Sequence, residues 1–207
     1  MNPSRIRCIL AQEAARILAE EGHKDYLKAK RKAAARLGLG QRYLPTNRQI
    51  RDALADRLRL FTVTPPPSVH LRRLRHAAHA AMTRLMAGIE TRAAGSVTED
   101  FATAHSVVEL HVFIEPPERL AIRLIEQGLD FQEGERRLHW GNGRTHTVPL
   151  FKFEYHGQSI EALAFTLNDL REPPTDPLDG RPARRIGLRM LKALLDETPA
   201  RPICASP

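Results

Sequence analysis

The chain has 207 residues, of which 32 are Lys or Arg, 24 are Asp or Glu and 2 are Cys, and its formal net charge is +8. A chain of this length can bury the core of one or two small domains. The cysteines, Cys8 and Cys204, lie near opposite ends without a motif around them, which excludes a disulfide framework and favours a reducing cytoplasm. No apolar run is long enough to cross a bilayer, and the first residues lack the apolar core of a signal peptide, so no membrane partner is expected.

The excess of positive charge lies in the first part of the chain. Residues 1–61 contain 14 Lys and Arg against 6 Asp and Glu, whereas the remaining residues contain 18 of each kind. This asymmetry favours a polyanionic partner for the first part. Arg greatly outnumbers Lys, and Ala and Pro are abundant, a composition typical of a GC-rich bacterial genome.

Helical patterns dominate the first third of the chain. Apolar residues at helical spacing predict helices from Ser4 to Gly22 and from Tyr26 to about Leu37. Thr46-Asn47-Arg48-Gln49 is typical of a capping box and predicts a third helix. Pro65-Pro66-Pro67 then breaks the pattern. We therefore predict a basic helical N-terminal region over residues 1–63.

Strand patterns follow one further helix, which is predicted from Ser68 to about Met86. Strands are predicted at residues 89–94, 107–114, 136–140, 146–155 and 159–166, with helices at 117–127 and 184–196. Asn142-Gly143 predicts a hairpin turn. The fold class predicted from this order is α+β, with a mixed β-sheet in a core over residues 68–197 and a loose tail over 198–207.

One stretch of the core carries a motif with a defined spacing. Gly95-Ser96 is followed, after a gap of nine residues, by Ser106-Val107-Val108-Glu109-Leu110. On a strand, Val107, Glu109 and His111 share one face, because alternate residues of a strand point the same way.

This stretch resembles the active-site motif of the DNA-polymerase-β-like nucleotidyltransferase superfamily, in which Gly-Ser precedes Ser-Asp-x-Asp-Leu. The resemblance covers residues 95–113 and implies a nucleotidyltransferase-like core over about residues 80–170. It implies that Gly95 and Ser96 hold phosphate groups, as backbone N–H groups at a helix start commonly do. It also implies that Glu109 and a carboxylate of a later strand, best matched by Glu161, hold divalent metal ions that bridge the reacting oxygens.

The chain departs from this family at the position of the first metal-binding Asp, where Val107 stands. A Val side chain has no oxygen to offer Mg²⁺. Glu99 and Asp100 follow Gly95-Ser96 and would repel a triphosphate. We therefore interpret the chain as a degenerate nucleotidyltransferase-fold protein, weak or inactive as a transferase, that binds a nucleotide or another phosphate ligand, and Mg²⁺ is a doubtful cofactor.

Besides an unrelated α+β interaction protein in which the Gly-Ser spacing is a coincidence, two alternatives remain open at this stage. The first is an active Mg²⁺-dependent nucleotidyltransferase that modifies a partner, with the metal held by Glu109 and Glu161 alone. His111 shares the face of Glu109 and is a further candidate ligand, in a carboxylate–imidazole set suited to transition metals. The second is a nucleic-acid-binding regulator that uses the basic N-terminal helices. Basic residues at four-residue spacing form a stripe on the second predicted helix, and the candidate contacts are Lys28, Arg31, Lys32 and Arg36. The sequence does not decide whether the chain is an enzyme or which substrate it takes.

Overall fold

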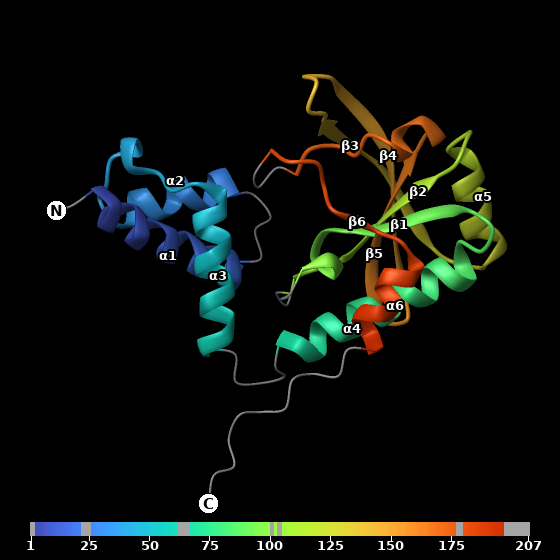
Figure 1. Cartoon of the computed structure of the whole chain (residues 1–207), viewed down its shortest axis with the longest axis horizontal. Helices are drawn as coiled ribbons and strands as arrows, with labels where there is room; N and C mark the ends of the chain where they lie inside the picture. The colour runs from blue at the N-terminus through green and yellow to red at the C-terminus, as the bar shows by residue number, and fades with distance from the viewer. Residues whose placement is uncertain are drawn as a thin grey trace, which may run out of the picture.

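The computed structural model describes residues 3–21, 26–61, 67–99, 102, 105–176 and 180–196. The first described helices are α1 (Pro3–Glu21), α2 (Tyr26–Arg36) and α3 (Asn47–Phe61), and Figure 1 shows them grouped together at one end of the molecule. They share a core of their own, in which α1 supplies the largest buried side chains, such as Leu10 and Ile17. Small alanines of α2, including Ala29 and Ala33, allow that helix to pack closely on α1.

The predicted capping box at the start of α3 is confirmed. The backbone N–H of Thr46 donates to Oε1 of Gln49 at 2.9 Å, and the N–H of Gln49 donates to Oγ1 of Thr46 at 3.2 Å. This reciprocal pair satisfies N–H groups that the first turn of a helix leaves without intrahelical partners. Of the predicted break at 64–67, residues 64–66 lie outside the described residues, as does the tail at 198–207, and Pro67 begins the next helix.

The second part of the molecule is built on a mixed sheet, so the α+β class is confirmed. Within the described residues, the sheet has six strands in the order β3-β4-β5-β2-β1-β6. The strands are β1 (Glu90–Ala94), β2 (Val108–Phe113), β3 (Phe131–His139), β4 (Thr145–Tyr155), β5 (Gln158–Phe165) and β6 (Arg185–Ile186). β2 and β5 run parallel, and the other neighbouring strands pair antiparallel.

Helices cover one face of this sheet. α4 (Pro67–Ala80), α5 (Glu118–Glu126) and α6 (Leu188–Asp196) pack on it, and Figure 1 shows α4 and α6 side by side. This face carries the larger core, which includes Val108, Leu110 and Ile160. The opposite face carries a smaller apolar cluster, with Phe113, Trp140 and Leu163 among its members. Between these apolar residues, the same face holds Glu109, His111 and Glu161, as the predicted alternation along 107–114 requires.

Several element boundaries differ from those predicted. The helix from Ser68 ends as a π-helical turn over Ala81–Leu85, and β3 begins at Phe131, five residues before the predicted strand. The closing helix is preceded by β6, which the sequence analysis missed because a two-residue strand has no measurable alternation. No helix in the described ranges is long and apolar enough to cross a membrane.

Candidate functional site

The parallel pairing of β2 with β5 brings two acidic side chains together. Glu109 of β2 and Glu161 of β5 are register partners, although they are far apart in the chain. Directly paired residues of neighbouring strands point to the same side of a sheet and lie close together. Glu161 is 7% exposed and Glu109 is half-buried, so a pair of carboxylates lies largely out of water on this face.

The predicted phosphate-binding residues lie next to this pair. β1 ends at Ala94, whose register partner is Glu109, and Gly95 begins a 3₁₀ turn, Gly95–Thr98. Gly95 has φ +63°, and a Cβ built on it would lie 3.5 Å from Cβ of Glu109. Glycine reaches this backbone conformation without the steric cost that a side chain imposes. The turn therefore lies directly against Glu109.

Two serines join the halves of the motif. Oγ of Ser96, in the turn, lies 3.2 Å from Oγ of Ser106, in the segment that leads into β2. Val107, between Ser106 and β2, is half-buried. The Gly-Ser pair and the acidic strand are therefore in contact through hydrogen bonding and packing.

Two arginines donate hydrogen bonds to backbone carbonyl oxygens in and directly after the turn. Arg75 of α4 donates from Nε to the carbonyl oxygen of Val97 at 3.1 Å and from Nη2 to that of Glu99 at 2.8 Å. Arg184 donates from Nη1 to the carbonyl oxygen of Thr98 at 3.0 Å. Nη1 of Arg51, in α3, lies 3.8 Å from Oε1 of Glu99, so an opposite charge partly compensates this acidic residue. Asp100, the other acid expected to repel a phosphate, lies outside the described residues.

A guanidinium group lies between the two carboxylates. Arg136 of β3 donates from Nη1 to Oε2 of Glu109 at 2.7 Å, and its Nη2 donates to Oε2 of Glu161. Nζ of Lys152, on β4, lies 3.6 Å from Oε1 of Glu161. Arg136 and Lys152 together carry the charge that balances the two carboxylates. Charge-assisted hydrogen bonds of this kind are roughly twice as strong as neutral ones.

His111 connects the acidic pair to a second arginine. Its Nε2 lies 3.0 Å from Oε1 of Glu109, and Nε of Arg185 donates to its Nδ1 at 2.6 Å. Arg185 also donates from Nη1 to the carbonyl oxygen of Asp169 at 2.7 Å, and its guanidinium carbon lies 4.8 Å from the ring centre of Phe165. Because Arg185 can only donate, Nδ1 of His111 accepts, and the ring proton is on Nε2.

The charge states of these groups follow from their surroundings. Burial alone would raise the pKa of Glu109, but the hydrogen bond with His111 and the positive charge of Arg136 lower it to about 2. Burial lowers the pKa of His111 and outweighs the opposite effect of Glu109. Burial also lowers the pKa of Arg185, to about 10. Hydrogen bonds connect four side chains in a row, in the order Arg185, His111, Glu109 and Arg136. At neutral pH the two arginines of this row are cationic, His111 is neutral and Glu109 is ionised.

These side chains, as they are placed, do not fit the divalent metal ions that the resemblance implies. Val107 has no ligand atom, both ring nitrogens of His111 are engaged, and Glu109 and Glu161 each bind Arg136. In the part of the chain that the structure describes, no group of three or more His, Cys, Asp or Glu side chains could hold a metal. Metal binding by Glu109, Glu161 and His111 stays a prediction.

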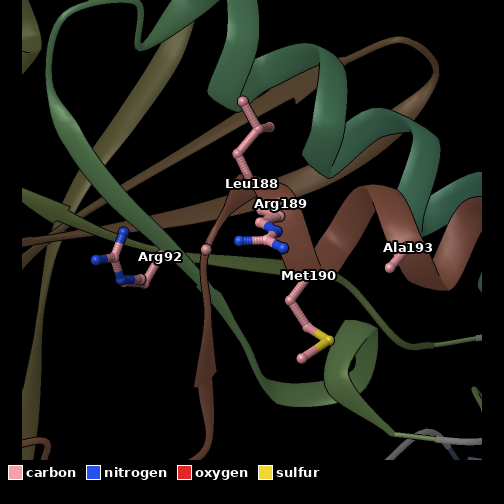
Figure 2. A pocket seen from close by; sticks show the side chains of 6 residues that line it. Arg92, Leu188, Arg189, Met190 and Ala193 are labelled. Atoms are coloured by element: carbon pink, nitrogen blue, oxygen red, sulfur yellow. The ribbon is translucent and has the colours of Figure 1, made fainter.

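An open cavity of about 670 Å³ lies elsewhere, at the edge of the sheet where α6 begins. Figure 2 shows residues that line it, Arg92 on β1 and Arg189 and Met190 on α6. Its lining does not include Gly95, Ser96 or the acidic pair. This cavity is therefore separate from the Gly-Ser turn and from the acidic pair.

Sequence reasoning missed Arg136, Lys152 and Arg185. A signal for Arg136 was present, since it alternates with Leu138 and Trp140, which places it on the inward face of its strand. The basic stripe of α2 lies in the helical region, where Lys28, Arg31 and Arg36 are exposed and Lys32 is half-buried. Arg36 also forms an ion pair with Glu13 of α1 at 3.3 Å. Nucleic-acid binding by this stripe stays a prediction.

Comparison of the chain with models of known protein families gives no match. A comparison with curated proteins gives no significant match either. The chain is an α+β protein whose described residues include a six-stranded mixed sheet. On this sheet, Arg136 forms ion pairs with two carboxylates that lie beside a Gly-Ser turn.

Proposed function

We propose that this protein is a degenerate nucleotidyltransferase-fold protein that binds a nucleotide or another phosphate ligand at the Gly95-Ser96 turn and does not transfer nucleotidyl groups. The observation that carries the proposal is the contact between three parts of the motif. The Gly95 turn lies against Glu109, and Glu109 is paired in register with Glu161. The resemblance implies this same arrangement of phosphate-holding turn and metal-binding strands.

The side chains linked to Glu109 carry more positive than negative charge, which favours an anionic ligand nearby. Arg185, Arg136 and Lys152 contribute three positive charges to the row of side chains that includes Glu109 and Glu161, which contribute two negative ones. The bonds that Arg75 and Arg184 make to carbonyl oxygens of the turn fix its backbone. A fixed backbone binds a ligand at a lower entropic cost than a loop that must first be ordered.

The same arrangement argues against transfer. Two-metal catalysis needs carboxylates that are free to bridge two divalent ions beside the attacking and leaving oxygens. Here the first carboxylate is replaced by Val107, and Arg136 engages both remaining ones. Arg136 holds its two partners at a geometry suited to a planar guanidinium, so it fixes their position without supplying the Lewis acid.

The test is a thermal-shift screen of inorganic phosphate and nucleoside triphosphates on the full chain, with and without Mg²⁺. Stabilisation by at least one phosphate ligand is expected in the wild type, and a loss of that stabilisation is expected in Ser96→Ala. Ser159→Ala is the matched control, because it removes the hydroxyl of an exposed serine of β5. If no phosphate ligand raises the melting temperature, or if Ser96→Ala responds as the wild type does, the proposal is wrong.

Transfer is tested separately by incubating the protein with labelled nucleoside triphosphates and Mg²⁺. No label is expected to appear on protein or nucleic acid acceptors, including the protein itself. Val107→Asp restores the missing carboxylate alone and is expected to remain inactive, since Arg136 still engages Glu109 and Glu161. Incorporation of label by the wild type would show that the active alternative is correct.

A further inference from the structure

We infer that Glu109 and Glu161 form a cation site whose permanent occupant is the guanidinium group of Arg136, which replaces a divalent metal ion and excludes one. The inference does not depend on whether the protein binds a nucleotide. It concerns side chains of β2, β3, β4 and β5.

The first argument is geometric. The two nitrogens of the Arg136 fork each reach a different carboxylate, Nη1 to Oε2 of Glu109 and Nη2 to Oε2 of Glu161. The guanidinium therefore bridges the two side chains, as a metal ion shared between two strands would. A planar fork with fixed donors suits this role better than an ammonium group does.

The second argument is the balance of charge. Two neighbouring carboxylates that are largely buried repel each other and require compensating positive charge. Arg136 supplies one positive charge between them, and Lys152 supplies another at 3.6 Å from Glu161. Nε2 of His111 donates to Oε1 of Glu109, because Nδ1 accepts from Arg185. The acidic pair is thus neutralised by side chains of the chain itself.

The third argument is that a metal ion would have to displace bonded groups. Oε1 of Glu109 is occupied by His111 and Oε2 by Arg136, while Glu161 is bound by Arg136 and lies near Lys152. A divalent ion would enter beside a guanidinium and an ammonium group, both of which repel it. Removing Arg136 should reverse this balance, because the two carboxylates would then lack their shared cation.

The experiment measures Mn²⁺ binding to the full chain through the electron paramagnetic resonance signal of free Mn²⁺. The wild type is expected to leave millimolar Mn²⁺ free. Arg136→Gln is expected to bind Mn²⁺ at least about tenfold more tightly than the wild type, the scale on which changes around a metal site act. The double variant Arg136→Gln/Glu161→Gln should lose this gain, and Arg137→Gln, an exposed neighbour on β3, should behave as the wild type.

Two results would overturn the inference. One is Mn²⁺ binding by the wild type that Glu161→Gln abolishes, and the other is an Arg136→Gln protein with a native circular dichroism spectrum that binds no Mn²⁺. If Arg136→Gln folds only when Mn²⁺ is added, the inference is supported. If Arg136→Gln stays unfolded in Mn²⁺, the guanidinium spectra of the wild type decide whether Arg136 is the resident cation.

That measurement follows the guanidinium signals of Arg136 in nitrogen-15 spectra of the wild type. A guanidinium held by two carboxylates should show slowed rotation of its Nη groups and no paramagnetic broadening when Mn²⁺ is added. Free rotation of these groups, or strong broadening by Mn²⁺, would show that Arg136 is not the resident cation.

Discussion

Nε of Arg185 donates a hydrogen bond of 2.6 Å to Nδ1 of His111, and this contact determines where the histidine carries its proton. An arginine has no acceptor, so Nδ1 must present its lone pair. The proton then lies on Nε2 and is donated to Glu109, at 3.0 Å. A cation of β6 thereby orients a neutral ring of β2 towards the acidic pair.

The tautomer is directly observable. Nitrogen-15 spectra at neutral pH should show His111 as a neutral ring protonated on Nε2. It should stay neutral as the pH falls below 6.5, because burial lowers its pKa from that value. Arg185→Met removes the donor to Nδ1 and a nearby positive charge, so the pKa of His111 should rise, while the ionised Glu109 still holds the proton of the neutral ring on Nε2. A wild-type ring protonated on Nδ1, or on both nitrogens at pH 7, would contradict the described contact.

The acidic pair should make the protein sensitive to acid. The pKa of Glu109 falls from 4.5 to about 2 on folding, so the ionised carboxylate stabilises the fold above about pH 4.5. This stabilisation is lost as the pH falls through the interval between these two values, because the unfolded chain takes up the proton first. Melting temperatures from pH 6 to pH 2 should therefore fall less steeply in Glu109→Gln than in the wild type.

Glu133→Gln provides the control for this measurement, because Glu133 is exposed on the same sheet. Its melting temperature should follow the wild-type curve over the whole range. Parallel curves for Glu109→Gln and the wild type would show that Glu109 contributes nothing to the acid sensitivity.

Arg136 should contribute to the stability of the fold, because it pairs with both carboxylates of the site. Arg136→Met leaves the half-buried Glu109 and the buried Glu161 without their shared cation. Because Arg136 and Glu109 keep some contact with water, the loss should be about 1–3 kcal/mol, less than for a fully buried ion pair. Urea unfolding at neutral pH measures this loss. Arg137→Met, at the exposed neighbouring position, should change the free energy of unfolding by less than about 0.5 kcal/mol. Equal effects of the two substitutions would contradict the prediction.

At Gly95, an alanine side chain would have room, but the backbone conformation would be unfavourable for it. A Cβ at this position would lie at ordinary contact distance, 3.5 Å, from Cβ of Glu109, but φ is +63°. Gly95→Ala should therefore cost about 1–2 kcal/mol, the penalty of the left-handed region, and Gly88→Ala should cost a similar amount, because Gly88 also has a positive φ. A much larger loss for Gly95→Ala in urea unfolding would show that the turn is packed more tightly against Glu109 than described.

The nucleic-acid alternative makes an independent prediction. If the stripe on α2 contacts phosphates, affinity for nucleic acid should fall steeply with salt, and Lys28→Glu/Arg31→Glu should reduce the salt slope by about 2. The reason is that each phosphate contact releases about one counterion. Fluorescence anisotropy with labelled RNA and DNA measures this. Arg72→Glu/Arg73→Glu, at exposed positions of α4, is the charge-matched control, and equal losses in both double variants would contradict a contact specific to α2.

Much of the local structure was predictable from local patterns. The helices of the first part, the capping box of Thr46 and Gln49, and the alternation that places Glu109 and His111 on one face of β2 depend on residues within a few positions of one another. Helical and strand periodicities and capping hydrogen bonds act over these short distances. The short strand β6 escaped prediction because its pairing with β1 comes from tertiary contacts.

The sequence by itself determined that Gly95-Ser96 stands nine residues before a strand pattern that carries the carboxylate of Glu109 and a Val at position 107, because spacing and residue identity are written in the chain. Only the tertiary structure decided what that carboxylate binds. Arg136 lies 27 residues from Glu109 in the chain, and Arg185 lies 74 residues from His111. Strand order and register bring these groups into contact, and they depend on packing of the whole sheet, which no local pattern encodes.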